Sequence, residues 1–284
     1  MELTSTTSQS VLKNLWNKDT HTFSSDMLKL TAIITMMIDH IGAGILEYLL
    51  YTDISASIPY NTLLIIYYIN MVLRLIGRIA FPIFCFLLVQ GFLHTRNRLK
   101  YTRNLLIFAL ISELPFDYLF AGEISFSTQN VFWTLLIGLL TLWVLEVIQN
   151  KEIHITLKTI VSLLAIAISL TVAAFLKTDY AWTGVLLILG LYFFREKLAL
   201  QCSIPFIVFL ISSIISNLAY FSSLQQTVVY VLLSKWTLFI PALMIYHCNG
   251  KRYMQKGKYF FYAFYPAHIA VLYVIQIILT NILQ

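Results

Sequence analysis

An Asp-His pair, Asp39 and His40, lies within the apolar stretch LKLTAIITMMIDHIGAGILEYLL near the start of the chain. Imidazole titrates near neutral pH, so His40 is a candidate general base. Successive residues of a helix point about 100° apart, so the two side chains do not form a simple hydrogen-bonded dyad. The alternative is that His40 only hydrogen-bonds a neighbouring helix, and that Asp39 is a packing or capping residue.

Two arginines, Arg74 and Arg78, lie four residues apart in RLIGRIAFPIFCFLLVQGFLHT and share one helical face. Long arginine side chains near the end of an apolar helix commonly extend to the membrane interface. The functional alternative is that Arg78 pairs with Asp39 or binds an anionic group of a substrate.

Three more ionisable residues lie in later apolar segments. Glu113 and Asp117 occur four apart in ISELPFDYLF, and His268 occurs in KYFFYAFYPAHIAVLYVI. A carboxylate pair on one face can relay protons or coordinate a cation, or it can pair with a buried cation. His268 is either a polar helix-packing residue or part of a vestibule facing the cytoplasm. No metal site is expected, because no H-x-x-x-H or H-E-x-x-H pattern occurs.

Two basic clusters, TRNRLKYTRN at 95–104 and NGKRYMQKGK at 249–258, follow apolar segments. The simple interpretation is cytoplasmic anchoring next to anionic lipids. The functional one is a site for the phosphates of a cytosolic co-substrate, held by charge-assisted hydrogen bonds. The candidate residues are Arg96, Arg98, Arg103, Lys251 and Arg252.

Composition indicates which elements must position these residues. Of the 284 residues, 59% are hydrophobic and only 11% are charged, against about 25% charged in an average soluble domain. This excludes a soluble globular enzyme, a disordered chain and a disulfide scaffold. The apolar runs are continuous over about 20 residues and do not alternate as β-barrel strands do, so the fold class is all-α.

The sequence predicts a polytopic membrane helix bundle of about nine to ten spans, residues 27–284, preceded by a polar cytoplasmic tail at 1–26. Segment 58–77 is either the tenth span or an interfacial helix. The nine other expected spans are 27–50, 79–95, 104–121, 129–149, 156–176, 180–195, 199–220, 226–247 and 259–282.

Positive charge favours nine spans and a cytoplasmic N-terminus, because that arrangement puts fifteen of the 19 lysines and arginines on the inner side. Segment 52–77 and the C-terminus are then external. The formal net charge of +6 follows from this anchoring, and no nucleic-acid partner is expected. The expected location is the inner, cytoplasmic membrane of the cell, with the lipid bilayer as a partner.

Several of these strings together resemble the TraX family, which takes its name from a conjugative-plasmid protein that acetylates the N-terminus of pilin. The resemblance covers residues 27–282. The strings are LKLTAIITMMIDHIGA, LRLIGRIAFPIFCFLLVQGFLHTRNR, ISELPFD, NVFWTLLIG, DYAWTGVLLI, NGKR and KYFFYAFYPAHIAVLYVI.

TraX proteins are in turn similar to a wider group of integral-membrane acyltransferases. That resemblance implies a catalytic histidine in an early span, here His40, and a patterned span at 78–91. It also implies an acetyl-CoA-binding arginine-rich loop at 96–103. The implied activity moves an acetyl group from cytosolic acetyl-CoA to an amine or hydroxyl of a pilin-like peptide or a glycan. His40 would act as base or transient acyl carrier, Asp39 or Arg78 would support it, and Arg96, Arg98, Lys251 and Arg252 would hold the phosphates.

Two other functions remain open from the residues alone. A proton-coupled transporter or flippase would use Glu113, Asp117 and His40, although no pair of interrupted spans marks inverted repeats. A non-catalytic assembly partner would tolerate the loss of His40.

Overall fold

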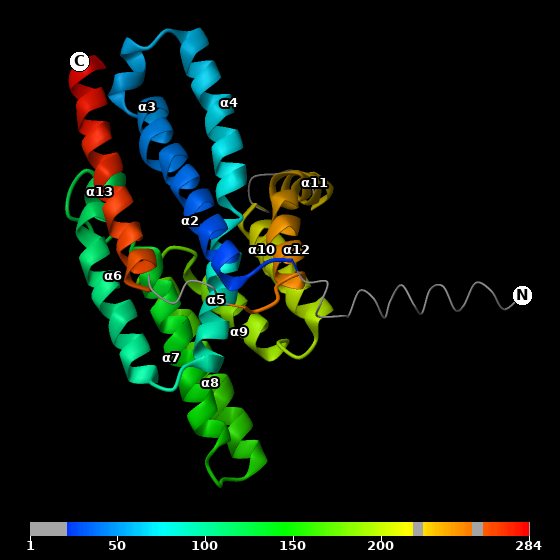
Figure 1. Cartoon of the computed structure of the whole chain (residues 1–284). Coiled ribbons are helices and arrows are strands. Elements are labelled where there is room, and N and C mark those ends of the chain that lie inside the picture. The colour runs from blue at the N-terminus through cyan, green and yellow to red at the C-terminus, as the bar shows by residue number, and fades with distance from the viewer. Residues whose placement is uncertain (1–21, 218–223, 252–257, 284) are drawn as a thin grey trace, which may run out of the picture.

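The computed structural model describes residues 22–217, 224–251 and 258–283, and most of these residues are helical. Figure 1 shows an elongated bundle with both blue and red helices at one end and the green pair α7 and α8 toward the other. The helices are α2 (Ser25–Ile41), α3 (Glu47–Tyr51), α4 (Tyr60–Gly77), α5 (Ala80–His94), α6 (Arg98–Ala121), α7 (Val131–Gln149), α8 (Ile155–Phe175), α9 (Ala181–Phe193), α10 (Leu198–Asn217), α11 (Leu224–Lys235), α12 (Phe239–Tyr246) and α13 (Lys258–Leu283).

The chain is a multi-pass membrane protein. Within the described ranges, seven helical segments are long and apolar enough to cross a membrane, and α9 and α12 are shorter apolar helices. Large apolar side chains also cover the outside of the bundle, as expected for a surface that contacts lipid. The helical bundle is therefore confirmed, whereas nine to ten spans are not: the seven candidates are Ser25–Tyr51, Tyr60–His94, Arg98–Ala121, Val131–Gln149, Ile155–Phe175, Leu198–Asn217 and Tyr259–Leu283.

Segment 58–77 folds as α4 and continues into α5 across a short turn at Arg78 and Ile79. Together they form one candidate span of 35 residues. At about 1.5 Å per residue, such a segment is about 52 Å long, whereas the hydrocarbon core of a bilayer is about 30 Å thick. The pair therefore fits one crossing with an extension beyond it.

Helices α5, α7 and α9 lie in the interior of the bundle and together contribute nearly half of the apolar side chains of the buried core. Helix α8 lies outside them and is mostly exposed. Polar side chains fix where several helices begin: Ser24 caps α2, Asn97 caps α6 and Asn130 caps α7. The predicted tail at 1–26 lies mostly outside the described residues, and its last two residues already belong to α2.

A π-helical turn, η2 (Gly42–Leu46), interrupts the first helical segment directly after α2. A π-turn leaves backbone groups out of the regular ladder, and such turns are frequent at functional sites. Here the side-chain amide of Gln276 on α13 donates to the carbonyl oxygens of Gly44 (2.9 Å) and Leu119 (3.2 Å). Helix α13 therefore ties the π-turn to α6.

Candidate active site

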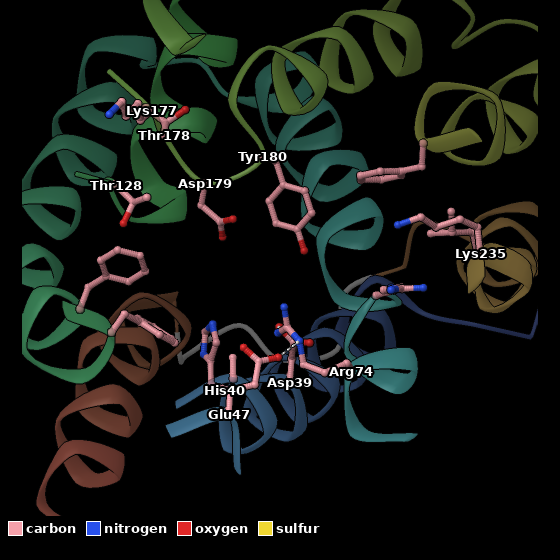
Figure 2. A pocket seen from close by; sticks show the side chains of 16 residues that line it. Asp39, His40, Glu47, Arg74, Thr128, Lys177, Thr178, Asp179, Tyr180 and Lys235 are labelled. Carbon is pink, nitrogen blue, oxygen red and sulfur yellow. Dashed lines mark ion pairs between the residues drawn. The ribbon is translucent and has the colours of Figure 1, made fainter. Parts of the chain in front are cut away.

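A polar cavity of about 560 Å³ lies between α2, α4, α6 and the loop that precedes α9. Figure 2 shows side chains from α2 and α4 facing those of this loop across it. Such a volume is typical of a small-molecule site. The charged and titratable residues that line it are Asp39, His40, Glu47, Arg74, Arg78, Lys177, Asp179, Tyr180 and Lys235.

His40 is held at the cavity wall by a chain of hydrogen bonds. Its Nδ1 lies 2.7 Å from Nε2 of His268, and Nδ1 of His268 lies 2.7 Å from the carbonyl oxygen of Phe264. A carbonyl only accepts, so Nδ1 of His268 carries a proton. In a neutral His268, Nε2 then accepts from Nδ1–H of His40. This leaves Nε2 of His40 with its lone pair, which is the state that a general base requires.

Asp39 forms an ion pair with Arg74. One Asp39 oxygen lies 2.6 Å from a terminal nitrogen of Arg74, and Nε of Arg74 lies 3.3 Å from Glu47. The absence of an Asp39–His40 dyad agrees with the helical geometry expected from the sequence. The sequence left a pair of Asp39 with Arg78 as one alternative. The ion pair is formed with Arg74, because Arg74 lies within α4 beside α2 whereas Arg78 begins the turn toward α5.

Close approach of α4 to α2 makes the Asp39–Arg74 pair possible. A Cβ atom at Gly77 would overlap the Asp39 side chain. Glycine is therefore the residue that fits at position 77, where α4 lies against Asp39.

Arg78 and Lys235 lie on the side of the cavity formed by the end of α11. A terminal nitrogen of Arg78 donates to the carbonyl oxygen of Ser234. The positive charges of Arg78 and Arg74 both act on the ammonium group of Lys235. This side of the cavity is thus cationic.

The loop before α9 contributes Asp179 and Tyr180. Lys177, Tyr180 and Ala181 have φ angles of 51°, 62° and 40°, a region that side chains other than glycine rarely adopt. The loop is held by a hydrogen bond from the Asp179 backbone N–H to the Gln129 carbonyl (2.8 Å). Strained backbone that its surroundings enforce is concentrated at functional sites.

Two electrostatic features follow from this loop. Burial, and then the nearby Asp39 carboxylate, raise the pKa of Asp179 to about 7 against the opposing charge of Arg74. Burial also raises the pKa of Tyr180 well above its usual value, so its hydroxyl stays protonated. Figure 2 shows that hydroxyl pointing toward Arg74 and Asp39, which makes it a hydrogen-bond donor at the cavity wall.

Several of these residues were missed by sequence reasoning. Asp179 and Tyr180 occur in the string DYAWTGVLLI, where only a family resemblance drew attention to them. His268 was interpreted as a packing or vestibule residue, and its contact joins residues 228 positions apart. No local periodicity indicates such a pairing. The sequence did indicate the location of the site, because Asp39, His40 and Glu47 all lie in the first apolar segment.

Those of the predicted phosphate-binding residues that the structure describes do not line the cavity. Arg98 is paired with Glu146 (2.6 Å) and stacks over Phe92. Arg96, Arg103 and Lys251 are exposed. Arg252 lies outside the described residues. The cytoplasmic co-substrate site therefore stays a prediction, separate from the cavity.

The carboxylates expected for a transport path are also apart from His40. Glu113 accepts hydrogen bonds from the side chains of Asn130 and Trp133, and Asp117 accepts from the backbone N–H of Ser125. Neither lines the cavity. In the described part of the chain, no group of three or more His, Cys, Asp or Glu side chains is arranged to hold a metal ion.

Comparison with known proteins finds a similar fimbrial protein and a matching family model. It is 28% identical over 259 residues to a Dichelobacter nodosus protein described as "probable fimbrial assembly protein FimC, serogroup H1", with 88% of this chain and 94% of that protein covered. No solved structure matches. The family model described as "TraX protein" matches residues 24–276. The chain therefore belongs to the TraX family.

Proposed function

We propose that this chain is a membrane acetyltransferase that modifies a pilus subunit during pilus assembly. The observation that carries the proposal is His40, which lines a polar cavity and whose Nδ1 is held by His268. The family and the fimbrial relative support the link to pilus assembly. Acetyl-CoA is the proposed donor, and an amine or hydroxyl of the pilin is the proposed acceptor.

In the proposed reaction, Nε2 of His40 removes a proton as the acceptor attacks the thioester carbonyl. The new bond to the acceptor forms as the carbon–sulfur bond breaks. The imidazolium then returns its proton to the departing thiolate, which leaves as free coenzyme A. His268 stabilises the imidazolium because it accepts the hydrogen bond from Nδ1–H of His40 throughout.

The protonated hydroxyl of Tyr180 is the donor best placed on the opposite wall for the developing oxyanion. The Asp39–Arg74–Glu47 cluster supplies fixed charges beside the reaction. In this proposal His268 orients His40, and Asp39 and Arg78 keep the electrostatic role expected of them.

The location of the cavity also bears on the route of the donor. His40 lies 15 residues after the start of α2, about 22 Å along the helix axis. If the nucleotide of acetyl-CoA binds at the inner basic loops, its acyl arm must extend toward mid-membrane to meet His40. Transient acetylation of His40 is the alternative where transfer crosses the membrane.

The experiment that tests the proposed function uses membranes that contain the chain, labelled acetyl-CoA and purified pilin from the same source. We expect labelled pilin whose intact mass has increased by one acetyl group. Membranes without the chain provide the control. Absence of chain-dependent acetylation at saturating acetyl-CoA would refute the proposed activity on this acceptor.

A further inference from the structure

Lys235 ends α11 and contributes its ammonium group to the cavity. The neighbouring Arg78 donates to the carbonyl of Ser234, so its guanidinium is attached to the residue just before Lys235. Both Arg78 and Arg74 act electrostatically on Lys235. Lys235 of α11 and Arg78 of the turn between α4 and α5 therefore lie on the same side of the cavity.

No carboxylate neutralises Lys235 in the described ranges, which contain every Asp and Glu of the chain except Glu2 and Asp19. Two of the cavity carboxylates, Asp39 and Glu47, already pair with Arg74. Lys235 is half-buried. Taking a charge out of water beside a like charge is costly unless an anion compensates it. The arrangement calls for an anionic ligand.

Charge and donor geometry favour phosphate over carboxylate as that anion. Arg78 and Lys235 present a guanidinium and an ammonium group to the same ligand, and a phosphate group offers such a pair more acceptor oxygens and more negative charge than a carboxylate does. A guanidinium offers a planar fork of donors to phosphate, and an ammonium offers a compact charge. This is the usual pair of side chains in phosphate sites.

Figure 2 shows Lys235 on the opposite side of the cavity from His40, with Asp39 and Arg74 between them. We propose that Arg78 and Lys235 form a phosphate-binding subsite that anchors one substrate while its reacting group lies at His40. The part concerning His40 rests on the proposed function. The phosphate belongs either to the coenzyme of the donor or to the headgroup of a phospholipid.

The test measures the binding of inorganic pyrophosphate to the full chain in detergent by calorimetry. We expect Lys235→Gln to weaken binding at least about tenfold, which corresponds to about 1.4 kcal/mol, and Lys235→Arg to bind as the wild type does. Lys177→Gln is the matched control, because Lys177 lines the same cavity but is exposed and lies far from Lys235. It should leave binding within about twofold.

Absence of pyrophosphate binding by the wild type, or equal binding by a folded Lys235→Gln variant, would overturn the subsite. If Lys235→Gln does not elute as a folded species, Lys235→Met keeps the unbranched stem without the charge and provides the same comparison. Competition by acetyl-CoA would assign the phosphate to the donor. Competition by dihexanoyl phosphatidic acid but not by acetyl-CoA would assign it to a phospholipid headgroup and would refute the anchoring of a substrate at this subsite.

These outcomes separate the subsite from the proposed function, because pyrophosphate binding involves no acetyl transfer. A chain that binds pyrophosphate through Lys235 but acetylates no pilin keeps the subsite and refutes the proposed activity. A chain that acetylates pilin, but binds pyrophosphate equally well with Lys235 replaced by glutamine, refutes the subsite and supports the proposed activity.

Discussion

Replacing His268 by alanine removes the acceptor that orients His40. The contact is a buried 2.7 Å hydrogen bond, and without it the Nδ1–H of His40 has no partner. An unsatisfied buried donor costs about 1–3 kcal/mol. If the full cost appears in the transition state, where His40 becomes cationic, the expected loss in kcat is about 5- to 150-fold. The KM for acetyl-CoA should stay unchanged, because His268 contacts His40 and does not line the cavity.

The assay is the initial rate of acetyl transfer to pilin by purified variants in proteoliposomes. His94→Ala is the matched control. Nδ1 of His94 lies 2.8 Å from the carbonyl of Gln90, the same local contact that His268 makes with Phe264, but His94 is exposed and has no second imidazole. His268→Gln restores a side-chain acceptor and should recover part of the rate. A folded His268→Ala variant with the wild-type kcat would refute the hydrogen-bond chain as a catalytic device.

Three further predictions address the surroundings of His40. Because the folded chain raises the pKa of Asp179 from 3.8 to about 7, it binds that proton more tightly than the unfolded chain, and stability should fall as pH rises between these values. The Tm of Asp179→Asn in detergent should therefore fall less than that of the wild type between about pH 5 and pH 8. An equal fall of Tm with pH in both proteins would contradict this. Gln276→Leu should lower the free energy of unfolding by about 1–3 kcal/mol, because the carbonyls of Gly44 and Leu119 lose their donor; unchanged denaturant midpoints would argue against that role. Gly77→Ala should cost about 1–3 kcal/mol by overpacking against Asp39 and should reduce acetyl transfer, whereas a variant with wild-type Tm and rate would show that α4 can move away.

The helical bundle could be predicted from the sequence because its signal is local. Continuous apolar runs specify membrane helices wherever they occur, and the structure has helices over each expected span within the described residues. The number of crossings was harder to predict. Segment 58–77 is apolar enough to span, but only its continuation into α5 shows that the two helices act as one segment.

The candidate site could be predicted only in part, for a physical reason. His40 stands out because an ionisable group is costly in an apolar helix. Its partner His268 cannot be recognised as such from the sequence, because the contact between the two histidines depends on the packing of α13 against α2. Arg74 and Arg78 share one helical face in the sequence, and only the turn after Gly77 decides which of them meets Asp39.

The most direct test of the central claim compares acetyl transfer to pilin by the wild type, His40→Ala and His94→Ala in proteoliposomes at saturating acetyl-CoA. General base catalysis contributes about 100- to 10,000-fold, so we expect a loss of that size in His40→Ala and none in His94→Ala. Transfer by a folded His40→Ala variant at the wild-type rate would contradict the assignment of the chemistry to His40.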